Sequence, residues 1–310
     1  MLQRIATIAF HTYRESVRAR ILYGLAALAL GTALYSIAIG AFSLRAAPRV
    51  VSDLGGASIS LYAIVVSIVI GGTSLYRELE QKTIFPILAR PIRRGEYLVG
   101  KYLGTVLTLF VFVAFDAFAV LLIIATMAGR SPVATAAVAA LPVLVLGIAA
   151  WKRPRLATVL PAPTALAALA VAGWLARVSP DEQRVVLGMS ALALLEVGVV
   201  AAFATLFASF SSPFLSAVFT FALFLVGRSA DALAKLPERT FGKTIHQMGV
   251  VLSKVMPNLQ VYAPPRPLLT GEAANESLWV HLGQASLQTL CWACLLLALS
   301  AVIFRRRDFL

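Results

Sequence analysis

Residues 95–102, GEYLVGKY, come close to a phosphate-binding loop. That loop needs Gly-x4-Gly-Lys followed by Ser or Thr, whose hydroxyl ligates magnesium, and it must join a strand to a helix. Here Tyr102 takes the hydroxyl position, and the stretch leads into a long apolar run. The sequence therefore predicts no nucleotide site and no cofactor bound by this chain.

The sequence also contains no motif typical of a metal site or of a hydrolytic active site. The three histidines, His11, His246 and His281, are not spaced as ligands on one helix, and no His-Glu-x-x-His or Gly-x-Ser-x-Gly is present. Cys291 and Cys294 lie in an apolar run without further ligands, so we interpret them as small buried apolar residues. The sequence predicts neither an enzyme nor a metal protein.

Two acids, Asp116 and Glu196, stand inside apolar runs. An ionisable group at membrane depth is costly, and it suggests a functional site such as a polar translocation path or a cation site. The alternative is a buried carboxyl, protonated or hydrogen-bonded to a neighbouring helix. Both interpretations stay open for Asp116, and the structural one is favoured for Glu196. The runs offer neither acid an Arg or Lys partner.

The composition indicates an integral membrane protein. Of the 310 residues, 60% are hydrophobic and 13% are charged, and the mean hydropathy is +0.86; a soluble domain has about a quarter of its residues charged. The net charge of +13 comes from basic residues between apolar runs, where membrane orientation needs them. We therefore expect a lipid bilayer around the chain and no nucleic-acid partner.

We predict an all-α polytopic fold with six core transmembrane helices, at residues 21–42, 58–76, 103–127, 186–208, 213–226 and 286–304. A further pair at 134–178 brings the total to eight, or forms a re-entrant hairpin. The even number puts both termini on one side, and the basic loops place that side in the cytoplasm.

The parts outside the spans have their own patterns within one permease domain, 1–310. Residues 2–20 predict an interfacial helix, with Arg4, Arg14 and Arg18 on its basic face as membrane-surface anchors. Residues 77–102 are a charged cytoplasmic segment. In the outer segment 228–285, we expect an interfacial helix at 241–256 and a stiff, extended proline-rich strap at 257–267.

Three stretches together resemble a known family. They are YRELEQKTIFPILARPIRRGEYLVGKYLG (76–104), LLEVGVVAAFATLFASFSSPFLSAVF (194–219) and IFRRRDFL (303–310). The chain resembles the membrane subunit of ABC transporters of the type-2 permease class, near the nitrous-oxide-reductase maturation permeases. That family usually has six spans, so the pair at 134–178 is a departure from it.

The resemblance implies a permease, which we expect to be an exporter, in the bacterial inner membrane. ATP and magnesium would bind two copies of a separate cytoplasmic subunit, and a second permease chain would complete a homodimer or heterodimer. The coupling contact would comprise Glu78, Glu80, Lys82, Arg90, Pro91, Arg93, Arg94 and Glu96. The alternatives are a loop whose charges only fix orientation, a non-transport anchor of an ATPase complex, and a self-contained secondary carrier.

Overall fold

The computed structural model describes residues 2–43, 46–80, 94–153, 156–235, 238–272 and 277–306, and these form helices and turns without strands. The elements are α1 (Leu2–Val17), α2 (Arg20–Phe42), α3 (Ala47–Glu80), α5 (Arg94–Met127), α6 (Pro132–Lys152), η1 (Leu156–Thr158), α7 (Pro161–Leu175), η2 (Ala176–Val178), α8 (Pro180–Ala208), α9 (Pro213–Arg228), α10 (Ala230–Ala234), α11 (Glu238–Val255), η3 (Leu259–Tyr262), α12 (Arg266–Thr270) and α13 (Leu278–Arg306). The predicted all-α architecture is confirmed.

Seven helices of the described chain are long and apolar enough to cross a membrane, which confirms a multi-pass membrane protein. They are α2, α3, α5, α6, α7 with η2, α8 and α13. The remaining predicted span, at 213–226, corresponds to α9. This helix has 16 residues and is about 24 Å long at the α-helical rise. Because the hydrocarbon core is about 30 Å thick, α9 alone falls short of it, and the total of eight spans stays a prediction.

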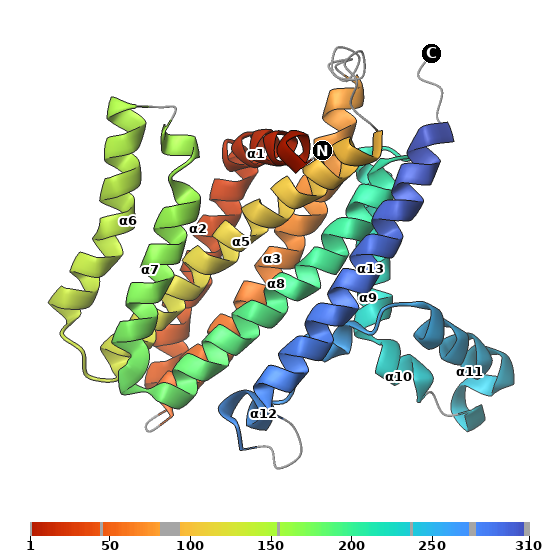
Figure 1. Cartoon of the computed structure of the whole chain (residues 1–310). Helices are drawn as coiled ribbons and strands as arrows, with labels where there is room; N and C mark the ends of the chain where they lie inside the picture. Colours follow the sequence, from red (N-terminus) through yellow and green to blue (C-terminus); the bar gives the residue numbers. More distant parts are fainter. Residues whose placement is uncertain are drawn as a thin grey trace.

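The centre of the bundle is made by α3, α5 and α8, which run side by side (Figure 1). Their contact surfaces carry small residues. A Cβ added at Gly71 of α3 would lie 2.5 Å from Ala204 Cβ of α8. Helices in lipid associate through such close backbone approach, since apolar side chains gain little by leaving lipid for protein.

The pair predicted at 134–178 forms α6 and α7, which lie at one side of the bundle (Figure 1). Pro142 sits inside α6 without ending it. Most of α6 is exposed, and only Thr135 and Pro142 are buried along it. A helix so uniformly apolar and exposed is suited to contact with lipid.

Two local expectations are wrong. Cys291 and Cys294 are exposed on α13, because the apolar run that holds them turns one face away from the bundle. The strap at 257–267 is not extended: η3 and the start of α12 are helical turns. The side chain of Asn258 caps η3 by accepting from Gln260 N at 2.9 Å, and this local bond favours a turn.

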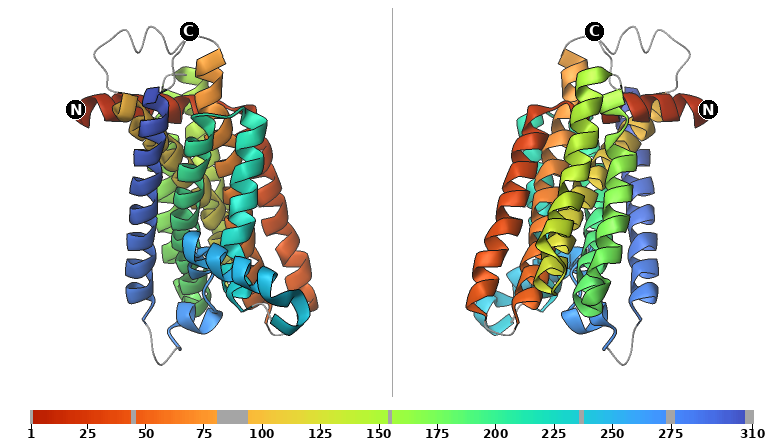
Figure 2. Two further views of the ribbon diagram at one scale, coloured as in Figure 1. Left: turned by 90° about the vertical axis from the view of Figure 1, so that its right-hand side faces the viewer. Right: turned by 90° about the vertical axis from the view of Figure 1, so that its left-hand side faces the viewer.

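Helix α1 crosses one end of the bundle at a large angle to the spans, and the last turns of α13 reach the same end (Figure 2). The opposite end carries α12 (Figure 2). Below, the two are called the α1 end and the α12 end.

Candidate functional site

Helix α1 is docked on the first half of α5 through two glycines. A Cβ added at Gly100 would lie 2.7 Å from Ile8 Cβ, and one at Gly104 would lie 2.4 Å from Ala9 O. Tyr13 of α1 is 1% exposed, and this burial raises the pKa of its hydroxyl to about 12. Gly100, the second glycine of the phosphate-loop-like stretch, is therefore a helix-packing residue.

The lysine of that stretch is also enclosed. Lys101 is 2% exposed, and its Nζ lies 5.8 Å from the centroid of the Tyr97 ring. The whole stretch from Gly95 to Tyr102 is α-helical within α5. A cradle of backbone N–H groups needs a loop, because the N–H groups inside a helix are already bonded along its axis.

The predicted coupling residues lie mostly beyond what the structure describes. Lys82, Arg90, Pro91 and Arg93 fall outside the described residues, and so do the side chains of Glu78, Glu80 and Arg94. What the structure does place is the two helices on either side. The last turns of α3 and the first turn of α5 both lie at the α1 end (Figure 1).

Glu96 is the coupling residue whose side chain is described. We expected it on an exposed surface, but it is 7% exposed. The reason is that α5 begins at Arg94, so Glu96 stands in its first turn beside the buried Tyr97 and Leu98. Its Oε2 has no hydrogen-bond partner within the described chain.

The three arginines predicted as membrane anchors have different surroundings. Arg4 and Arg18 are exposed. Arg14 is half-buried: its Nε donates to Thr158 Oγ1 at 3.0 Å, and its guanidinium lies 5.9 Å from the centroid of Phe10. Arg14 thus fastens α1 to η1, the turn between α6 and α7.

Asp116 is buried in the second half of α5, with 4% of its surface exposed. Neither carboxylate oxygen has a hydrogen-bond partner among the described residues. A buried carboxyl without a partner is costly, and its burial needs a proton, a water or a ligand. The structure thus keeps Asp116 as a candidate functional group.

Glu196 has a basic partner, contrary to our expectation. Its side chain is 0% exposed, Arg228 Nη1 donates to its Oε1 at 2.7 Å, and Ser60 Oγ donates to its Oε2 at 3.0 Å. Sequence reasoning missed Arg228 because the predicted span ended at residue 226. Helix α9 continues for half a turn beyond that point and carries Arg228 to α8.

Residues 257–272 follow α11, include the stretch 257–267 predicted as a strap, and form a second contact with the bundle; from here on, the whole of 257–272 is called the strap. Its backbone accepts from Gln288 Nε2 at Asn258 O (2.9 Å), and Val261 O lies 2.8 Å from His281 Nε2. Tyr262 reaches Thr289 Oγ1 at 2.8 Å. These bonds tie the strap to α13.

Arg266 joins the strap to α3 and α8. It donates to Glu182 Oε2 at 2.6 Å and to Asp53, and Ser52 donates to the same Glu182 carboxylate. Partial burial disfavours its charge, but the hydrogen bonds and charges of Glu182 and Asp53 outweigh burial and hold the pKa of Arg266 above its ordinary value. This cluster ties α12 to α3 and α8.

The fold and these sites define a polytopic membrane protein in which several charged groups pair between helices. Among the described residues, no group of His, Cys, Asp and Glu is placed to hold a metal ion. The chain belongs to the ABC-2 family of transporter proteins: the model of the family described as "ABC-2 family transporter protein" matches residues 6–309. A comparison with curated proteins found no match. The chain is therefore a permease-type membrane component.

Proposed function

We propose that the chain is the permease subunit of an exporter driven by a separate ATP-binding subunit. The observation that carries the proposal is the family match over residues 6–309, nearly the whole chain. Within the family, the nitrous-oxide-reductase maturation subgroup stays our proposal, based on the three stretches quoted above. ATP and magnesium would bind the partner subunit.

The geometry of α3 and α5 supports coupling through the segment between them. Each helix has 34 residues, which is about 51 Å at the α-helical rise and well beyond the hydrocarbon core. The end of α3 projects past α1 (Figure 2). A force applied to residues 81–93 would therefore act on two helices of the central core at once.

The charge distribution supports a cytoplasmic α1 end. Basic residues gather there, and positive charge favours the cytoplasmic side of a membrane. They include Arg4, Arg14, Arg18, Lys152 and Arg153. On this reading the ATP-binding subunits, in two copies, meet the bacterial inner membrane protein at the α1 end, and a second permease chain completes the complex.

Reversing the charges of Arg93 and Arg94 to glutamate tests the coupling contact. We expect co-purification with the ATP-binding subunit to weaken by about tenfold or more, because like charges placed across an interface repel. Pull-down from solubilised membranes measures it. The matched control is Lys152→Glu with Arg153→Glu, the same charge change at the end of α6. If the Arg93/Arg94 variant inserts poorly but its inserted fraction binds normally, the coupling role is wrong.

Replacing Asp116 by asparagine tests the translocation role. Asparagine keeps the shape and loses the ionisable proton, so export of a fluorescent amphiphile or peptide carried by the wild-type complex should fall by about tenfold or more. Binding of the ATP-binding subunit should not change. Asp181→Asn is the control, since Asp181 is exposed in the first turn of α8. Unchanged export in the Asp116 variant would assign a structural role.

A further inference from the structure

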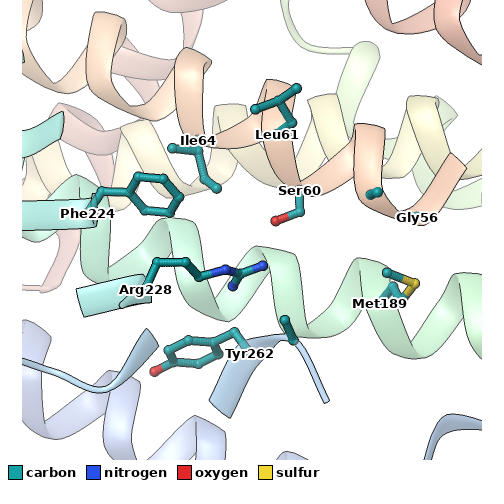
Figure 3. Close-up of a pocket in the computed structure, with 10 residues that line it drawn as sticks. Gly56, Ser60, Leu61, Ile64, Met189, Phe224, Arg228 and Tyr262 are labelled. Atoms are coloured by element: carbon teal, nitrogen blue, oxygen red, sulfur yellow. The ribbon is translucent and has the colours of Figure 1, made fainter. Parts of the chain in front are cut away.

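A cavity of about 270 Å³ lies beside the Glu196–Arg228 pair, between α3, α8, α9 and the strap. We call it the Arg228 cavity. Its walls are mostly apolar, and the guanidinium of Arg228 extends along it with Ser60 on one side and Tyr262 on the other (Figure 3). The lining residues are Gly56, Ala57, Ser60, Leu61, Ile64, Met189, Phe224, Arg228, Tyr262 and Ala263.

The cavity is lined by residues of two candidate membrane spans, α3 and α8, and it opens to the outside of the bundle. Ala57 and Leu61 line the cavity on the span α3, and both are exposed. An occupant can therefore enter from the lipid side.

Arg228 has hydrogen-bond donors left for such an occupant. One nitrogen, Nη1, donates to both Glu196 Oε1 (2.7 Å) and Leu259 O (3.3 Å). No described residue accepts from Nε or Nη2, and the side chain is 31% exposed. A guanidinium has five N–H donors, and donors left unpaired in apolar surroundings are costly.

The other polar groups of the cavity are already engaged. Ser60 donates to Glu196, and the Tyr262 hydroxyl is bonded to Thr289. The acceptor for Arg228 must therefore come with the occupant. Because Glu196 already balances the charge of Arg228, a second anion beside that buried carboxylate would be costly, and a neutral acceptor fits better.

The size of the cavity limits the rest of the occupant. Its volume of about 270 Å³ is just below the range of about 300–1,000 Å³ that holds a whole drug-sized ligand. A single apolar chain suits walls made of Leu61, Ile64, Met189 and Phe224. We propose that the Arg228 cavity binds one acyl chain of a neutral ester-linked lipid, whose ester carbonyl accepts a hydrogen bond from Arg228. This proposal goes beyond the permease function and does not depend on it.

Binding of 1-lauroylglycerol to the purified full chain tests the proposal, with native mass spectrometry as the measurement. We expect one saturable site. The ether analogue 1-O-dodecylglycerol has the same chain length without the carbonyl, and it should bind about tenfold more weakly, as a lost hydrogen bond to a charged donor predicts. Lauroyl lysophosphatidate, an anion, should also bind more weakly than the neutral ester.

A matched pair of variants locates the site. Ala57→Trp places an indole in the cavity from an exposed position and leaves Glu196 and Arg228 in place. It should weaken binding of 1-lauroylglycerol by about tenfold or more, because excluding two methylene groups already has that effect. Ala140→Trp, at an exposed position of α6, should bind like the wild type.

Several results would overturn the proposal. Equal affinity of the Ala57→Trp variant and the wild type would mean that the lipid binds elsewhere. Equal affinity of ester and ether would remove the role of Arg228, and the absence of any saturable binding would leave the cavity to water. Tighter binding of the anionic lysophosphatidate would contradict a neutral occupant.

Discussion

Replacing Arg228 by methionine is expected to lower the free energy of unfolding by about 3–5 kcal/mol, the range for breaking a buried ion pair by removing one partner. The physical reason is that Glu196 is 0% exposed. Without Arg228, its carboxylate would keep Ser60 as its partner and would have to bind a proton or stay charged at membrane depth. Unfolding in mixed micelles, followed by circular dichroism, measures the change.

The double variant Glu196→Gln with Arg228→Met separates the cost of an unpaired charge from the loss of contacts. It should be more stable than the Arg228→Met single variant, because no unpaired buried carboxylate remains. Arg184→Met is the control, since Arg184 is exposed and makes one 3.5 Å bond to Thr270 O; it should change stability by about 0.5 kcal/mol or less. A double variant no more stable than the single one would contradict the role assigned to the pair.

Replacing Gly104 by leucine is expected to detach α1 from α5. The new Cβ would lie 2.4 Å from Ala9 O and 2.6 Å from Thr12 Cβ. The first of these is a backbone atom, so α1 itself has to move. We expect a cost of about 3 kcal/mol, at the upper end of the usual penalty for overpacking, and a larger exposure of the buried face of α1.

Cysteine labelling can follow this detachment. Ser16 is 6% exposed in α1, so a Ser16→Cys probe in a background lacking Cys291 and Cys294 should react slowly with a thiol reagent. Gly104→Leu should accelerate the labelling by about tenfold or more, because it lowers the free energy needed to detach α1 from α5 by about 3 kcal/mol. Gly147→Leu serves as the control, because a Cβ there meets nothing within 4 Å. Equal labelling rates in both variants would show that α1 does not need Gly104.

Much of the fold could be predicted from local composition. The apolar run at 103–127 ends at Met127, where α5 also ends, and the pair at 134–178 forms α6 and α7. Span prediction works because each helix in lipid must form all of its backbone hydrogen bonds internally and must present an apolar surface over a known length. The predicted ends of the helices were less accurate, because α3 and α5 continue into polar sequence, where hydropathy does not distinguish helix from loop.

The sites depended on contacts that hydropathy does not encode. Arg228 was assigned to an outer segment, yet it pairs with Glu196 on another helix. The same holds for Arg266, which reaches Asp53 and Glu182 from a strap expected to be extended. Glu96 was expected at the surface because it is charged, but the packing of Tyr97 and Leu98 buries it.

The amino-acid sequence by itself determined the class of this protein. Long apolar runs require membrane helices, and Tyr102 stands where a phosphate loop needs Ser or Thr. Only the tertiary structure decided which residues act together. Gly100 and Gly104 contact α1 closely, and Arg228 pairs with Glu196 and lines a cavity. The reason is that apolar length is a property of one segment, whereas a buried pair or a cavity arises from the register at which separate helices cross.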